Sequence, residues 1–235
     1  MRLHTTTWGS GDRTALLVHG LMADHRTWRR VGPALAGHGY RVIAVDLRGH
    51  GASARAAGPE AYRPEDHADD LVENLPVEAE LAIGHSLGGL VLAQAVERLR
   101  PSRAVYSDPA WHLAAGPCGY RPELFTRGKT LTPEQVKGFN PHWSDEDLDL
   151  EMASVRDWDE RTAHGLAPSV GADLWPSRPA VPSLVALADP SFLVRPEHAR
   201  MLTERGFELR TVKGAGHTIH RDDFDGFMSV LEGWI

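Results

Sequence analysis

Short apolar runs alternate with longer amphipathic stretches through most of this chain. Five runs are almost wholly aliphatic, and a sixth alternates more weakly; they lie at 15–18, 42–45, 81–83, 104–106, 184–187 and 208–212. Runs of four or five buried residues are typical of parallel strands covered on both faces. Apolar residues at helical spacing predict helices over 87–99, 196–205 and 222–234 between and after these runs. The pattern therefore predicts an α/β fold with a mostly parallel, doubly wound sheet.

Residues capable of chemistry follow the predicted strands. His19, Asp46, Ser86, Asp108 and Asp189 each come directly after, or within three residues of, one of the first five runs, and His217 follows the sixth; this set is otherwise scattered in the sequence. Because the carboxyl ends of parallel strands meet at one edge of a sheet, we expect these side chains to converge there.

The segment 111–179 interrupts the alternation. It lacks a clear strand, holds four of the seven tryptophans, and contains two helix starts, at Thr132 and at Ser144, each with a side chain suited to cap the helix. We expect a helical lid inserted between the strands that end near Asp108 and Asp189, so that residues 1–110 and 180–235 form one core domain around the lid at 111–179. We expect the large tryptophan side chains to pack this segment against the core domain. Three of them are also candidates to line a substrate pocket: Trp111, Trp143 and Trp158.

Composition excludes several functional classes. The 235 residues carry a formal charge of −7, and acidic and basic residues are interspersed. The sequence therefore predicts no basic face that could bind a nucleic acid. No stretch approaches the ~20 apolar residues of a membrane span, and the amino terminus has no signal-peptide pattern, which favours a cytoplasmic protein without membrane association. Cys118 is the single cysteine; its loop-like surroundings argue against a reactive thiol.

The sequence Gly84-His85-Ser86-Leu87-Gly88 places a serine between a predicted strand and a predicted helix. Glycines two residues before and after the serine permit the strained, crowded turn that exposes such a nucleophile. The pentapeptide alone arises by chance at an appreciable rate, and its position between strand and helix supplies the stronger argument.

Three further motifs carry a resemblance to a known family: Val18-His19-Gly20-Leu21, the loop from Asp46 to Ser53, and Gly214-Ala215-Gly216-His217. With the serine motif, and in this order, they resemble the α/β-hydrolase superfamily, in particular its small lid-bearing serine esterases and peroxidase-like hydrolases. The resemblance covers nearly everything outside the lid.

The resemblance implies a role for several residues. Ser86 would be the nucleophile, His217 the general base, and the backbone amides of Leu21 and Leu87 the oxyanion hole. We expect His19, His50 and His85 to be structural, and Asp46 and Arg48 to pair with each other. His220 could compete with His217, or join it and Asp223 in a metal site, but packing near the last helix is the favoured interpretation.

The acid that orients His217 has two candidates. Asp108 and Asp189 each end a strand and each precede a proline. The family usually places the acid after the strand that follows the lid, which favours Asp189 and leaves Asp108 as the alternative. The turn before Asp189 is shorter than the family pattern.

These residues predict an enzyme that cleaves a carboxylic ester, thioester or lactone through an acyl-enzyme, with no cofactor and no metal. The expected partner is a small, moderately apolar substrate, and the oligomeric state is open. Carbon–carbon hydrolases, lyases and cyclases with the same three residues are an alternative, as is a binding protein that retains them. Epoxide or haloalkane opening calls for an aspartate nucleophile, so serine at position 86 argues against both.

Overall fold

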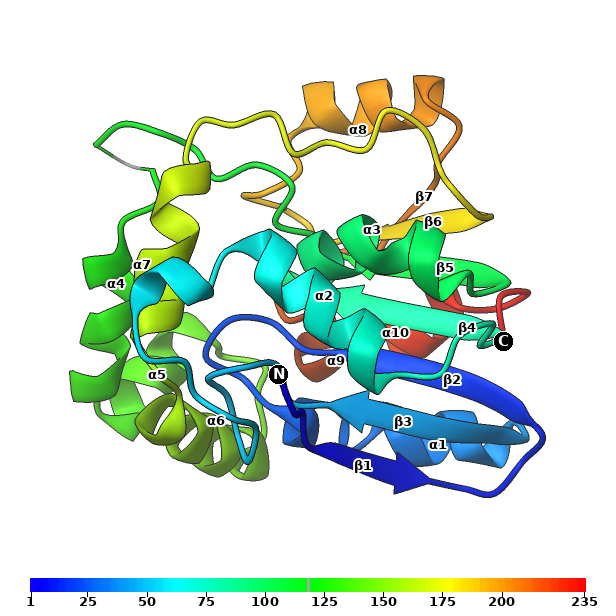
Figure 1. The fold of residues 1–235 in the computed structure, drawn as a ribbon, viewed down its shortest axis with the longest axis horizontal. Coiled ribbons are helices and arrows are strands. Elements are labelled where there is room, and N and C mark those ends of the chain that lie inside the picture. The colour runs from blue at the N-terminus through cyan, green and yellow to red at the C-terminus, as the bar shows by residue number, and fades with distance from the viewer. Residues whose placement is uncertain (118) are drawn as a thin grey trace.

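A seven-stranded sheet forms the centre of the molecule in the computed structural model, which describes residues 1–117 and 119–235 (Figure 1). The strand order is β1-β3-β2-β4-β5-β6-β7, and only β1 runs antiparallel to its neighbour. The strands are β1 (Thr5–Trp8), β2 (Arg13–Val18), β3 (Tyr40–Val45), β4 (Leu81–His85), β5 (Arg103–Ser107), β6 (Ser183–Leu187) and β7 (Glu208–Thr211). β2 to β6 are aliphatic and almost entirely buried, as covered parallel strands should be.

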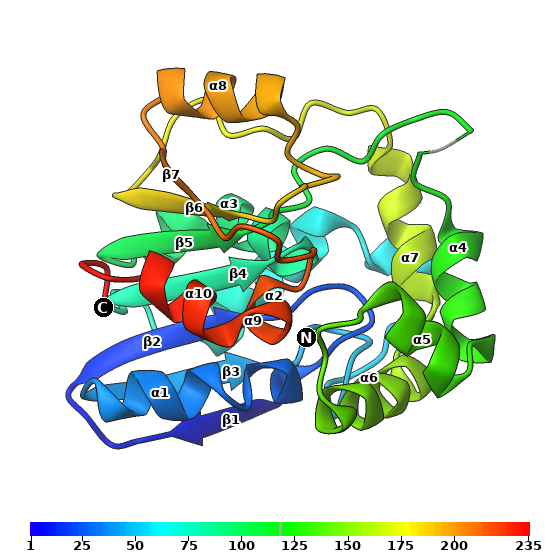
Figure 2. The ribbon, with the colours of Figure 1, turned by 180° about the vertical axis from the view of Figure 1, so that it is seen from behind.

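Helices cover both faces of this sheet. One face packs against α2 (Pro64–Asn74), α3 (Leu87–Leu99) and α8 (Pro196–Glu204). The opposite face, toward the viewer in Figure 2, packs against α1 (Val31–Gly37), α9 (Ile219–Asp222) and α10 (Phe224–Val230). Each layer has its own apolar cluster, so the sheet lies buried between two cores.

The segment between β5 and β6 is helical, as its sequence predicts. Its elements are α4 (Pro122–Thr126), η3 (Arg127–Thr130), α5 (Pro133–Phe139), α6 (Asp145–Asp157), α7 (Arg161–Leu166) and η4 (Ala167–Ser169). The hydroxyls of Thr132 and Ser144 accept hydrogen bonds from the amides of Gln135 and Asp147, which caps α5 and α6. Figure 1 shows α4 to α7 gathered beside the sheet, and we refer to residues 111–179 as the helical insertion.

Most predicted elements are present, and three differences have clear causes. Strand β1 was not predicted, because its threonines form an edge strand that is only half-buried. The helix predicted over 222–234 is shorter, because Asp223 has non-helical torsions and caps it: α10 spans Phe224–Val230, and the short helix α9 precedes Asp223. The expected pair of Asp46 and Arg48 is wrong: the Arg48 Nε donates to Asp70 at 2.6 Å.

Two further expectations concern the chain's surroundings. None of the helices among the described residues combines the length and apolar character needed to cross a bilayer. The expectation for Cys118 lies outside the described residues.

Candidate active site

Ser86 occupies a sharp turn between β4 and α3. Its backbone torsions are φ 52° and ψ −116°, a strained conformation for a residue with a side chain. The Ser86 amide donates to the carbonyl of Ser107 at 3.0 Å, and the Ser86 carbonyl accepts from Ala110 at 3.0 Å. These bonds to the next strand hold the turn in place, with the serine side chain at the carboxyl end of the sheet.

The two glycines of the motif are required by close backbone approach. A Cβ on Gly84 would lie 2.5 Å from the carbonyl oxygen of Gly88, and one on Gly88 would lie 2.3 Å from that of Val18. Both distances are far below any ordinary contact, so the strand, the turn and the helix fit together only with hydrogen at these positions.

His217 lies in the loop between β7 and α9 and packs against the residue that precedes Ser86. The rings of His85 and His217 are 4.7 Å apart, and His85 Nε2–H donates to the His217 carbonyl at 3.0 Å. Burial lowers the pKa of His85, and the nearby His217 lowers it further. A neutral His85 therefore holds the His217 loop beside the serine turn.

Asp108 is the carboxylate that pairs with His217. The His217 Nδ1–H donates to Asp108 Oδ2 at 2.6 Å, and the Asp108 side chain is fully buried while that of His217 is 24% exposed. This hydrogen bond fixes which ring nitrogen carries the proton and leaves Nε2 free to act as a base.

The preference for Asp189 as this partner is therefore wrong. The Asp189 residue is exposed, and its backbone amide donates to the Ala215 carbonyl at 2.9 Å. Two features explain the outcome: β5 lies directly beside β4 while β6 is one strand further away, and Asp108 adopts a positive φ of 41° that redirects the chain after β5.

The two amides predicted as oxyanion donors come from the turn after β2, which carries Leu21, and from the start of α3, which carries Leu87. In the part of the chain that the structure describes, the amides of Leu21 and Leu87 donate to no other protein group. Leu87 begins the 13-residue helix α3, where the first amides are unpaired and the helix dipole favours negative charge. A Cβ on Gly20 would lie 3.1 Å from the Ser86 Cβ, so the Leu21 turn approaches the serine closely.

His19 and His50 hold this turn, as expected of structural histidines. His19 Nδ1–H donates to the Gly20 carbonyl, and its Nε2 accepts from Leu47. His50 Nδ1–H donates to the Arg48 carbonyl at 2.9 Å and its Nε2 accepts from Met22 at 3.3 Å. Burial, together with His19, lowers the pKa of His50 to about 3, so it remains neutral and able to accept from Met22.

His220 is also structural. Its Nε2 lies 2.8 Å from the Thr27 hydroxyl and its ring stacks on Trp28 at 4.3 Å. Asp223, the third residue of the alternative metal site, instead accepts from the Gly226 amide and caps α10. The structure therefore supports neither alternative role of His220.

The three tryptophans proposed for the pocket are packed elsewhere. Trp111 is fully buried against Tyr106 and Phe207, while Trp143 forms a small cluster inside the insertion. Trp158 packs in one cluster with Met22 and Leu21 and so stabilises the turn that follows β2. Their size makes them good packing residues, and packing cannot be distinguished from pocket lining by sequence.

An apolar cavity of about 400 Å³ lies one side chain away from His217, at Phe192. Phe192, 69% exposed, packs against the His217 ring at 4.9 Å and lines this cavity. The other lining residues come from the insertion and from the loop after β6: His112, Leu113, Ala114, Gly119, Tyr120, Leu124, Phe125, Leu193 and Arg195. One signal for Phe192 was present in the sequence: it follows a predicted strand, in a loop at the carboxyl edge of the sheet.

The comparisons with known proteins agree with this architecture. Residues 15–230 match the model of the alpha/beta hydrolase family. This chain belongs to that family. A relative that matches almost throughout is N-formylmaleamate deformylase of Pseudomonas putida, 26% identical over 98% of this chain and 91% of its own length.

Two other relatives have different activities. An epoxide hydrolase of Caballeronia sordidicola is 37% identical, but the match covers 37% of this chain and 27% of that protein's length. The solved structure of an esterase from Exiguobacterium antarcticum aligns with a TM-score of 0.79 over 99% of this chain and 94% of that one, at 20% identity. The family is therefore that of hydrolases with diverse substrates.

Proposed function

We propose that this chain is a serine hydrolase that cleaves a carboxylic ester, thioester or lactone through an acyl-enzyme on Ser86. The observation that carries the proposal is the strained Ser86 turn beside a His217–Asp108 hydrogen bond of 2.6 Å. A serine hydroxyl is a weak nucleophile until a positioned base accepts its proton, and this pair supplies such a base.

The proposed reaction proceeds in two halves. His217 Nε2 takes the Ser86 proton as Oγ attacks the substrate carbonyl, and the amides of Leu21 and Leu87 stabilise the oxyanion. His217 then protonates the leaving alcohol, thiol or ring oxygen. Water, deprotonated by His217, releases the acid and restores the serine, while Asp108 stabilises the imidazolium in both halves through its hydrogen bond to Nδ1–H.

The substrate is proposed to be a small, moderately apolar molecule. The cavity beside Phe192 has mostly aliphatic and aromatic walls, which suit an acyl or alcohol group of moderate size. The partial match to epoxide hydrolases does not alter the proposal, because Ser86 stands where epoxide opening calls for a carboxylate.

Hydrolysis of an amide is a second candidate. The relative that matches over most of both chains is named a deformylase. The same serine, histidine and oxyanion donors would attack a formamide carbonyl, with His217 protonating the leaving nitrogen.

A substrate panel tests both candidates. Chromogenic esters of graded acyl length, a thioester, a lactone and an N-formyl amide are compared on wild type, Ser86→Ala and Ser102→Ala, the last an exposed serine away from the site. We expect turnover of at least one carbonyl class, lost by about 10³-fold or more in Ser86→Ala and retained in Ser102→Ala. Turnover independent of Ser86 would refute the mechanism, and carbon–carbon cleavage would replace it with the lyase-type alternative.

A further inference from the structure

A second cluster of functional side chains lies away from Ser86. His4 precedes β1, His25 begins the short helix η1 (His25–Trp28), and Asp46 follows β3. Their possible ligand atoms all lie within 4.8 Å of one another, and no other group of three histidine, cysteine, aspartate or glutamate residues meets that criterion among the described residues. Three segments distant in sequence thus bring two imidazoles to one carboxylate.

The contacts within this cluster are short and directed. His4 Nδ1 lies 3.0 Å from Asp46 Oδ2, and His25 Nδ1 lies 2.8 Å from Asp46 Oδ1. The carboxylate is fully buried, and it is oriented by the backbone amides of His25 at 2.7 Å and Ala52 at 3.0 Å. Backbone donors that fix a carboxylate in this way are the usual second layer around a bound metal ion.

We propose that His4, His25 and Asp46 form a binding site for a divalent transition-metal ion, with Zn²⁺ the best match. Metal–ligand bonds of about 2.0–2.2 Å place neighbouring ligands roughly 3 Å apart, close to the nitrogen–oxygen distances here. Two imidazoles with one carboxylate are borderline-soft donors that favour Zn²⁺, Co²⁺ or Ni²⁺ over Mg²⁺ or Ca²⁺.

Binding requires a change of tautomer in each histidine and an approach of the two rings to one ion. The Nδ1 proton of each ring moves to Nε2 of the same ring, and the freed Nδ1 lone pairs bind the ion. Within residues 1–117 and 119–235, neither Nε2 is hydrogen-bonded to a protein group, so each can carry a proton. The two backbone hydrogen bonds to Asp46 are kept.

The site is open on one side. The His4 side chain is 39% exposed, and it lines a cavity of about 480 Å³ together with Arg2, Thr5, Ala52 and Ser53. The cavity reaches the cluster at His4, so an ion and a water ligand would enter from the His4 side. An ion with three protein ligands would connect the amino-terminal segment to η1, which follows the turn that carries Leu21, and so would stabilise the fold there.

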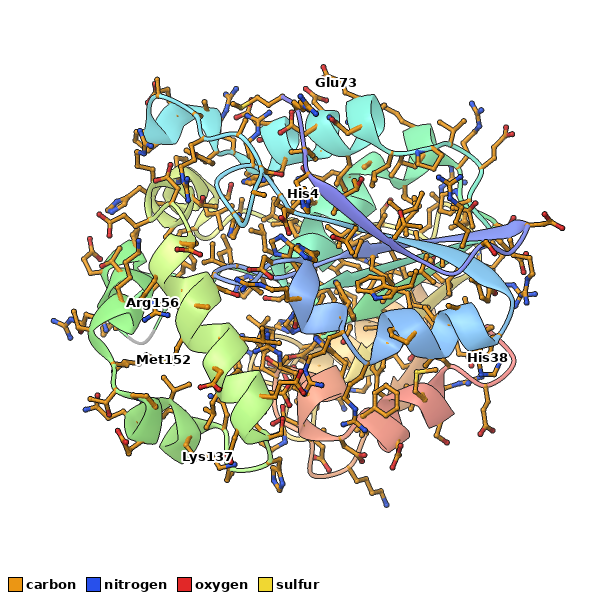
Figure 3. The ribbon with its side chains drawn as sticks, turned by 90° about the horizontal axis from the view of Figure 1, so that it is seen from below. His4, His38, Glu73, Lys137, Met152 and Arg156 are labelled. Atoms are coloured by element: carbon orange, nitrogen blue, oxygen red, sulfur yellow. The ribbon has the colours of Figure 1, made fainter. Side chains whose placement is uncertain are left out.

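The test uses the full chain without an affinity tag, freed of metal by a chelator and titrated with Zn²⁺ in a calorimeter. His4→Gln removes the imidazole but keeps a donor toward Asp46, and His25→Gln serves as an independent second variant. His38→Gln is the matched control, because His38 is an exposed histidine at the end of α1, well separated from His4 (Figure 3).

We expect wild type and His38→Gln to bind one Zn²⁺ at this site with the same micromolar or tighter dissociation constant. Both cluster variants should bind at least about tenfold more weakly. A hundredfold excess of Zn²⁺ over the dissociation constant should raise the melting temperature of wild type by roughly 5–10 °C. Absence of Zn²⁺ binding by wild type, or equal binding by wild type and the two folded cluster variants, would overturn the proposal.

Discussion

Replacing Asp108 by asparagine separates the two candidate acids most directly. The Asp108 carboxylate is fully buried and accepts the 2.6 Å hydrogen bond from His217 Nδ1. Asparagine has nearly the same shape, but it removes the charge that stabilises the imidazolium and can hold the ring in the wrong tautomer. In a serine–histidine–aspartate site such a change lowers kcat by about 10⁴-fold, or roughly 5.4 kcal/mol at 1.36 kcal/mol per tenfold.

Asp189→Asn is the matched comparison. The Asp189 side chain is exposed, and its backbone amide, which donates to Ala215, is unchanged by the substitution. We expect kcat to stay within about threefold of wild type and stability within about 0.5 kcal/mol.

The assay measures kcat and KM for both variants on an ester that wild type hydrolyses, with melting temperature and circular dichroism to confirm folding. A large loss in Asp108→Asn with a folded protein supports the assignment. The reasoning would be refuted if folded Asp189→Asn lost activity by more than about a hundredfold while Asp108→Asn kept most of it.

Three other predictions rest on single contacts. Gly88→Ala should lower the free energy of unfolding, measured in urea, by about 1–3 kcal/mol or more, because the new Cβ would lie 2.3 Å from the Val18 carbonyl oxygen. Gly37→Ala is the control: the space around Gly37 is open, and the free energy of unfolding should change by less than about 1 kcal/mol. His50 is buried and its pKa is lowered to about 3, so as the pH falls this histidine is protonated in the unfolded chain before it is protonated in the folded one. The free energy of unfolding should therefore drop by up to about 1.4 kcal/mol per pH unit from pH 6.5 toward 3. His50→Gln should flatten that slope when urea unfolding is measured at each pH. An unchanged slope in the variant would contradict this origin. Phe192→Ala should raise KM for longer-chain esters by about tenfold with little change in melting temperature, because the exposed ring packs on His217 and lines the cavity. A KM for longer-chain esters that is the same in Phe192→Ala and wild type would contradict that role.

The features that the sequence predicted well are those determined by local constraints. Short, continuous aliphatic runs are typical of covered parallel strands, and the run at 81–83 with the helix at 87–99 placed Ser86 between them. The glycines of the motif had a local reason as well, since the chain must pass close to itself at such a turn.

Features set by contacts between distant segments were harder to predict. The three tryptophans predicted to line a pocket have the same composition signal whether they pack against a core or face a substrate, and none of them is among the residues that line the cavity. Arg48 likewise has a carboxylate two residues away at Asp46, yet it pairs with Asp70 on α2 because the loop brings that helix alongside. Neither choice is visible in the order of residues.

The choice between Asp108 and Asp189 depends on the sheet order and on one backbone torsion. Both carboxylates follow strands that end at the same edge, but β5 is hydrogen-bonded to the strand that carries Ser86, and the positive φ of Asp108 turns the chain there. Because Asp108, which follows β5, already orients His217, no residue of the loop after β6 is required for that role. That loop instead carries Phe192, which packs on the imidazole and lines the cavity. In the proposed enzyme the same arrangement therefore assigns the chemistry to the loops after β2, β4, β5 and β7, and leaves the loop after β6 free to select the substrate.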